Sequence, residues 1–166
     1  MSVDTNWPRW IYASVSKHFV EGMEADSLTV FLEGTERNME ALGQEFMEYR
    51  QDGPMFRPLD KIAGGNYRYK AWIDVNIIFR VNINDGSFHR IHEVTGLVAK
   101  RFVDCISIYK YGSGVDDTGE FLTHFQLDYE NRNPIDINHF GQVDKDLSIM
   151  QGSVSGQYIG YLTTSN

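Results

Sequence analysis

The feature that most constrains the fold of this sequence is a run of alternating apolar and polar residues between positions 73 and 83. Its apolar members occupy every second position: Ile73, Val75, Ile77, Phe79, Val81 and Ile83. The intervening positions are polar, apart from Ile78. Because successive side chains of a strand point to opposite faces, the run predicts a long, half-buried antiparallel strand. Tyr67, Tyr69 and Ala71 share the apolar parity, which allows the strand to begin as early as Tyr67.

Two segments have the periodicity of amphipathic helices. In the first, from Pro8 to Met23, apolar side chains recur every fourth residue. They are Trp7, Ile11, Val15 and Phe19. Asn6 is a suitable N-cap, and Pro8 fits the first turn, where its missing N–H loses no hydrogen bond. The second helix is expected between Phe88 and Asp104. Its apolar stripe includes Ile91, Val98, Phe102 and Cys105.

The remaining pattern predicts an α+β protein. Short apolar runs predict strands at 28–32, 106–111, 121–129 and 153–162, with a short extended piece at 135–140. The segment 35–52 fits either a helix or a strand, and periodicity does not decide between them. Glycine and proline mark two loops, about 53–66 and 112–120, which we expect to be mobile. We therefore expect a mainly antiparallel sheet flanked by two helices, in one domain spanning residues 1–166.

Composition argues against several classes of protein. The formal net charge is −8 and the pI is about 5.0, whereas proteins that bind duplex DNA or anionic membranes need a basic surface. No apolar run approaches the roughly 20 residues of a membrane-spanning helix, and the N-terminus does not resemble a signal peptide. A single cysteine allows no intrachain disulfide. These observations predict a soluble intracellular protein.

Motifs that carry chemistry are scarce. His89 and His92 lie three residues apart on the second predicted helix and share a face that suits zinc, but metalloproteases space their histidines by four with a glutamate between. We therefore interpret them as part of a polar helix surface. Cys105, at an apolar helix end, is expected to be a buried and inert thiol. Asp116 and Asp117 are typical of a solvated acidic loop. The residues therefore argue against an enzyme and against a metal site, but they leave an enzyme open.

Aromatic side chains are frequent on predicted strands that have a polar face. They are Tyr67, Tyr69, Trp72, Tyr109, Tyr111, Tyr158 and Tyr161. Because tyrosine and tryptophan are enriched at protein interfaces, they favour a subunit of an assembly. The alternative is that they belong to an ordinary core and sheet surface.

The order and spacing of these elements resemble those of tail terminator and neck (head-tail joining) proteins of tailed bacteriophages. The likeness starts with the helix Pro8–Met23 and the strand Leu28–Leu32, which ends in Glu33-Gly34. Arg50-x-Asp52-Gly53-Pro54 then precedes the strand Tyr69–Ile83 and the helix Phe88–Asp104. The chain closes with Phe140-Gly141-Gln142 and Gln151-Gly152-Ser153-Val154-Ser155-Gly156-Gln157-Tyr158. The resemblance covers nearly the whole chain and lies in element order, not in a signature motif.

This resemblance implies a structural virion protein that assembles in the host cytoplasm and has no catalytic activity and no cofactor. Such subunits form a ring, commonly a hexamer, which caps the tail tube and joins it to the head connector. Genomic DNA passes through the lumen without specific binding, and no membrane is involved. We expect subunit or lumen contacts at Tyr67, Tyr69, Trp72, Asp74 and Arg80. We expect loop contacts with stacked partners at Phe56, Arg57, Lys61, Asp116 and Asp117.

Two other functions stay open at this point. One is a head-completion or tail-tube subunit of similar fold. The other is a small α+β ligand-binding protein or enzyme, whose candidate residues are His89, His92, His124 and His139.

Overall fold

The computed structural model describes residues 3–35, 45–82, 89–112, 119–130, 133–142 and 149–164. The elements in chain order are α1 (Trp7–Ala25), β1 (Val30–Leu32), β2 (Phe46–Lys61), the short 3-10 helix η1 (Ala63–Gly65), β3 (Tyr67–Asn82), α2 (His89–Ala99), β4 (Cys105–Lys110), β5 (Glu120–Leu127), β6 (Ile135–Gln142) and β7 (Ile149–Thr163). These elements confirm the α+β class, with a curled, mostly antiparallel sheet and two helices.

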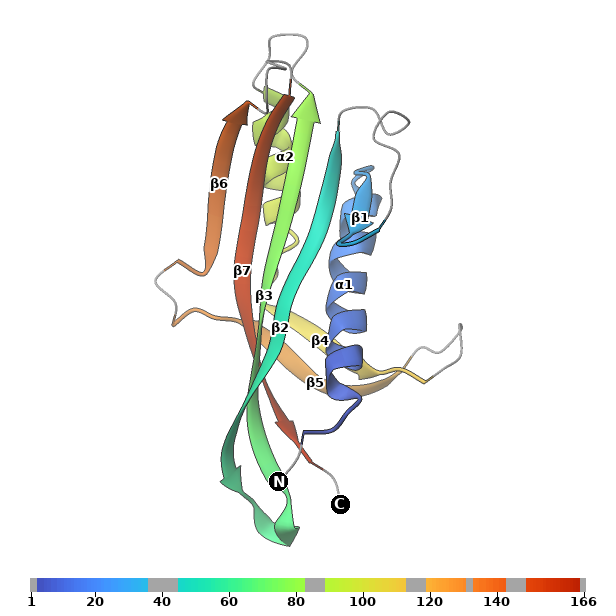
Figure 1. Cartoon of the computed structure of the whole chain (residues 1–166), viewed down its shortest axis with the longest axis vertical. Coiled ribbons are helices and arrows are strands. Elements are labelled where there is room, and N and C mark those ends of the chain that lie inside the picture. Colours follow the sequence, from blue (N-terminus) through green and yellow to red (C-terminus); the bar gives the residue numbers. More distant parts are fainter. Residues whose placement is uncertain are drawn as a thin grey trace.

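One seven-stranded sheet carries the fold, with strand order β1-β2-β3-β7-β5-β4 and β6 added beside β7. Among the described pairs only β1–β2 is parallel. Both helices cover the same face of the sheet, α1 against β1, β2 and β4, and α2 against β3 and β7 (Figure 1). α2 lies toward the end of the molecule opposite the β2–β3 turn. The other side of β2, β3 and β7, which we call the open face, has no helix on it.

β3 confirms the alternating pattern. From Tyr69 to Val81 every odd-numbered residue is buried and faces the helices, while the even-numbered residues lie on the open face and are partly exposed. The strand begins at Tyr67, as the parity of the tyrosines predicted. β2 pairs with one edge of β3, and β7 pairs with the other over fifteen successive residues. Because both edges are paired, β3 is the centre of the sheet.

The prediction of a loop at residues 53–66 was wrong for most of this segment. β2 continues through Gly53-Pro54 to Lys61, and the chain turns only at η1. The glycine and proline instead mark a bulge, where the β2–β3 register shifts between Asp52 and Met55. Gly53 has a φ of 91°, and a Cβ there would lie 3.0 Å from the carbonyl oxygen of Trp72, so the position suits glycine. Ladder pairing on both sides of the bulge outweighs the local turn signal.

The other expectations can be placed against the described elements. The ambiguous segment 35–52 is a strand from Phe46 onward, whereas residues 36–44 lie outside the described residues. α2 ends at Ala99 and not near Asp104, because Lys100 to Phe102 form a turn whose N–H groups bond to Gly96, Val98 and Ala99. Cys105 is consequently the first residue of β4 and is exposed, so its expected burial was wrong.

The core is a single cluster between the helices and the sheet, with Phe19 of α1 at its centre. The Phe19 ring centroid lies 4.8 Å from that of Phe102, 5.8 Å from that of Tyr49 and 6.4 Å from that of Tyr158. Burial in this apolar site raises the pKa of the Tyr49 hydroxyl far above its ordinary value. The Tyr49 hydroxyl donates a hydrogen bond of 2.6 Å to Gln51. Phe19 therefore joins α1 to three other parts of the fold.

We expect Phe19→Ala to lower the free energy of unfolding by about 3–5 kcal/mol, because it removes a fully buried ring and leaves a cavity. Urea unfolding measures the change. Phe121→Ala is the matched control, since Phe121 is 49% exposed, and its loss should stay below about 1 kcal/mol. Equal losses for the two variants would contradict the central role of Phe19.

A charge cluster ties the end of α1 to the turn after α2. The Asp26 carboxylate accepts hydrogen bonds from Lys100 Nζ at 2.8 Å and from an Arg101 guanidinium N–H at 2.5 Å. These two bonds, that of Lys100 first, hold the pKa of Asp26 below its ordinary value of 3.8. His18 on α1 adds a hydrogen bond of 2.8 Å from Nε2 to the Arg101 carbonyl. The two helices are thereby connected at one point outside the apolar core.

Asp26→Asn tests this connection through pH. Because the folded-state pKa of Asp26 is depressed, its stabilising contribution is present above pH 3.8 and is lost as the pH falls below that value. The variant should therefore unfold more readily than the parent chain at pH 7, and the difference should shrink toward zero as the pH falls through this range. Urea unfolding at a series of pH values measures it. A difference that does not depend on pH would contradict the charge-based explanation.

Candidate assembly surfaces

The expected strand contacts fall on two different faces of β3. Tyr67 and Tyr69 have odd numbers and face the helix side, whereas Trp72, Asp74 and Arg80 lie on the open face. Tyr69 is 3% exposed and packs edge-on against Trp7 at a centroid distance of 5.6 Å. Tyr69 is therefore a core residue, and almost none of its side chain is left for the lumen or subunit contact expected there.

The open-face residues differ in their partners. Asp74 accepts a hydrogen bond of 2.9 Å from the side-chain amide of Gln157 on β7, and it does not pair with Arg80. The Arg80 guanidinium carbon lies 5.7 Å from the centroid of Phe46, and its Nε is buried without a hydrogen-bond partner in the part of the chain that the structure describes. Trp72 is half-buried between Met55 of β2 and Ile159 of β7.

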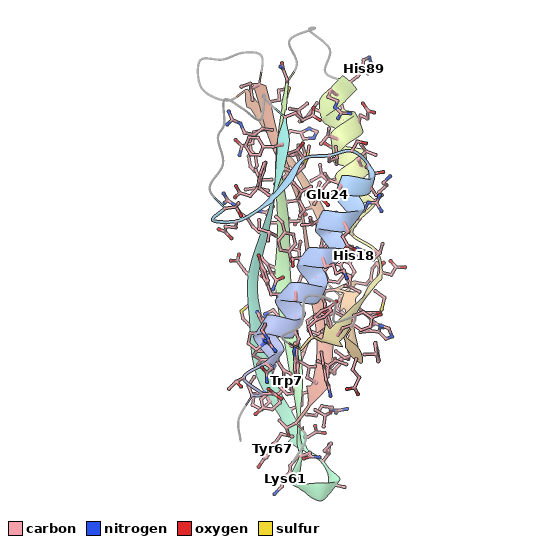
Figure 2. All side chains as sticks on the ribbon, turned by 90° about the vertical axis from the view of Figure 1, so that its right-hand side faces the viewer. Trp7, His18, Glu24, Lys61, Tyr67 and His89 are labelled. Carbon is pink, nitrogen blue, oxygen red and sulfur yellow. The ribbon has the colours of Figure 1, made fainter. Side chains whose placement is uncertain are left out.

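The second surface is the arm, which we define as residues 58–67 at the end of the β2–β3 hairpin. It projects beyond the part of the sheet that the helices cover, with Lys61 and Tyr67 at its tip (Figure 2). Asp60 and Arg68 pair at its base through two hydrogen bonds of 3.1 and 3.2 Å. Leu59 and Ile62 expose 41% and 36% of their surface. The arm is thus an ordered structure that presents apolar side chains to solvent.

The residues expected in loop contacts are distributed differently from the prediction. Phe56 is half-buried against Trp7, at a centroid distance of 5.8 Å, so it anchors the hairpin to α1. Arg57 is exposed on the open face, and Lys61 lies at the arm tip with its Nζ 6.0 Å from the Tyr67 ring. Asp116 and Asp117 lie outside the described residues.

The open face also contains side chains that were not among the expected subunit contacts, although Tyr161 was among the aromatic residues noted in the sequence. Met55, Lys70, Ile159 and Tyr161 surround Trp72 on β2, β3 and β7. Tyr161 is 54% exposed and Met55 is 41% exposed. The even-numbered parity of β3 already pointed to Lys70. The position of Met55 depends on the bulge, which no sequence pattern revealed.

A cleft of about 470 Å³ lies along the contact between α1 and the edge strand β4. Its walls include Lys17, His18 and Glu21 from the helix, and Cys105 and Tyr109 from the strand. Its volume is within the range of small-molecule pockets, but charged and polar side chains line most of it, whereas such pockets are mainly apolar.

The exposure of Cys105 gives a direct test. We expect a maleimide reagent to label one thiol per chain in native buffer, because Cys105 is the single cysteine and its side chain is accessible. Mass spectrometry before and after denaturation measures the labelling, with Cys105→Ser as the unlabelled control. Labelling that appears only after denaturation would support the original expectation of a buried thiol.

The histidines of the alternative enzyme function do not form one site. His92 of α2 and His139 of β6 have ring centroids 5.4 Å apart, and His139 Nε2 lies 3.1 Å from the hydroxyl of Thr95. His124 lies on β5, where its Nδ1 is 3.2 Å from the Ser107 hydroxyl. His89 is exposed at the start of α2. Within the described ranges no group of three or more histidine, cysteine, aspartate or glutamate side chains suits a metal ion.

Neither described helix is long and apolar enough to cross a membrane.

The comparisons with known proteins do not assign the chain to a family. No protein-family model and no curated protein matches the sequence. Among solved structures, a protein whose name states no function aligns with 95% of this chain and 96% of its own, at 19% sequence identity and a TM-score of 0.46. A likeness of that size carries no argument about function.

Proposed function

We propose that this chain is a structural subunit of a tailed bacteriophage, namely a tail terminator or neck protein. Its copies would form a hexameric ring. The ring would cap the tail tube and join it to the head connector, with genomic DNA passing through its lumen. The subunit would assemble in the host cytoplasm and remain in the virion. This function involves no catalysis, cofactor or membrane.

The observation that carries the proposal is the arm. A hairpin that extends past its own core, held by the β2–β3 ladder with the exposed Asp60–Arg68 pair beside it and exposing Leu59 and Ile62, is suited to contact a neighbouring subunit. A contact between the arm of one copy and a different surface of the next is heterologous, and such contacts close into rings when the rotation permits. The element order that resembles tail terminator and neck proteins supports the same conclusion.

The arm also explains why the ends of the molecule differ. The arm and both chain termini lie at one end, whereas α2 and β6 lie toward the other (Figure 1). A ring of such subunits would have two unlike surfaces. A neck ring needs this polarity because it meets the tail tube on one side and the head connector on the other.

Electron microscopy of tailed particles that contain the chain tests its position. We expect gold-labelled antibody against the chain to mark a single position at the neck. Label along the whole tail, together with long tubes formed by the purified chain, would favour a tube subunit, and label inside the head a head-completion role. Absence of the chain from purified particles would overturn the virion proposal altogether.

The role of the arm has its own test. We expect the double variant Leu59→Asp, Ile62→Asp to fold normally, because both side chains are exposed, and to fail to incorporate into particles. Incorporation is measured by mass spectrometry of particles assembled with the variant as the sole source of the chain. The matched control, Ala25→Asp with Thr29→Asp, adds the same charge at exposed positions away from the arm and should incorporate normally. Normal incorporation of the arm variant would contradict the proposed contact.

A further inference from the structure

The open face carries like charges directly opposite each other. In the β2–β3 ladder Asp52 is the partner of Asp74, and Arg57 is the partner of Lys70. Met55 and Trp72 form the pair between them. Side chains in facing positions are about 5 Å apart at Cβ, and like charges at that distance repel. The ladder therefore has an acidic pair, an apolar pair and a basic pair in that order.

This arrangement depends on the bulge in β2. Asp52 and Met55 are three positions apart, which in a regular strand would place them on opposite faces. The register shift between them restores a common face, so that Asp52, Met55 and Arg57 all lie on the open side. Gly53 provides the backbone conformation that the bulge needs.

The chain itself does not neutralise these charges. In the part of the chain that the structure describes, Asp52, Arg57 and Lys70 make no ion pair, and Asp74 has only the neutral amide of Gln157. Lys70 and Asp74 are four residues apart, or about 13 Å along a strand. That distance exceeds the Debye length of about 8 Å at physiological ionic strength, so the attraction between the acidic pair and the basic pair is largely screened by salt.

Each charged pair borders a hollow. Asp52 and Asp74 line one of about 240 Å³, to which β6 adds a third carboxylate, Asp136. Arg57 and Lys70 line another of about 170 Å³. Asp128 also reaches this second hollow, where its carboxylate accepts a hydrogen bond from the backbone N–H of Glu130 and, among the described contacts, makes no ion pair with Arg57 or Lys70. Both hollows have room for a side chain from outside.

We propose that the open face binds the open face of a second copy of this chain. The two sheets would lie face to face, related by a two-fold axis that runs across the strands close to Trp72. This operation reverses the strand direction, so Lys70 of each copy meets Asp74 of the other, and Arg57 meets Asp52. The sequence of acidic, apolar and basic pairs is thereby complementary to itself, which is the property of an isologous interface.

The centre of the face suits this occupant. Trp72, Met55 and Ile159 form an apolar area with charged pairs at both ends, and Tyr161 lies beside Lys70 in the β3–β7 ladder. Interfaces concentrate their binding energy in central aromatic residues surrounded by polar groups. A nucleic acid would meet the basic pair but also four carboxylates, and a partner of uniform charge would be repelled at one end. A second copy matches both ends.

The pairing is independent of the proposed ring. Ring closure uses the arm in head-to-tail contacts, whereas this interface joins two copies related by a two-fold axis. A chain that forms no ring would therefore still pair. Two rings joined in this way would have two like outer surfaces, so the pairing describes the purified chain and not the ring at the neck.

Charge reversal tests the pairing with purified protein. Sedimentation velocity over a range of concentrations should show the parent chain, or its ring, in equilibrium with a species of twice the mass, weakened by added salt. Lys70→Asp and Asp74→Lys, each alone, should raise the dissociation constant at least tenfold, because each makes the two facing positions alike in charge. An equimolar mixture of the two variants should recover association, since every reversed contact is then complementary.

The controls decide between pairing and simple damage. The double variant Lys70→Asp, Asp74→Lys keeps the face self-complementary and should also associate, whereas Lys17→Asp on the exposed side of α1 should leave the dissociation constant unchanged. Circular dichroism checks that each variant folds. Parent protein that never doubles its mass would overturn the proposal. Loss of association in both single variants without recovery in their mixture would overturn it too, and would indicate a partner of different sequence.

Discussion

Everything in this fold depends on the pairing of β3 along both of its edges. β2 occupies one edge and β7 the other, so the backbone polar groups of β3 are satisfied without the helices. The helices are then needed only to cover one set of side chains. Those side chains alternate strictly, so one face of β3 is buried and the other is partly exposed to solvent. The positions of the core and of the open face both follow from this alternation.

β7 adapts to this arrangement through its composition. On its helix-facing side, Gly152, Gly156 and Gly160 alternate with Val154, Tyr158 and Leu162. A Cβ on Gly152 would lie 2.7 Å from the Phe79 ring, and one on Gly160 would lie 2.1 Å from that of Phe125. The glycines thus make room for large aromatic rings from neighbouring strands. The spacing of glycines in β7 therefore matches the size of aromatic side chains that lie far away in the sequence.

The sequence predicted the features that depend on local periodicity. The alternation of β3, the start of α1 and the strands after α2 follow from it, and so does the placement of Trp72, Asp74 and Arg80 on one face. It failed where pairing with a distant strand decides the outcome. Gly53-Pro54 signals a turn locally, but the ladder with β3 keeps it extended. Tyr69 was expected at a contact although its apolar parity already placed it on the core face, where it packs against Trp7. The facing charge pairs need the register of β2 on β3, and no pattern within either strand contains it.

The bulge between Asp52 and Met55 has a consequence for how this chain tolerates change. The residues of β2 beyond it keep their faces because the bulge absorbs one extra position. Deletion of a single residue at this point would leave Asp52 and Met55 two positions apart, which is the spacing of a regular strand, so Phe56 and Arg57 would keep their faces without the bulge. The left-handed backbone conformation of Gly53 is needed only as long as the extra residue is present.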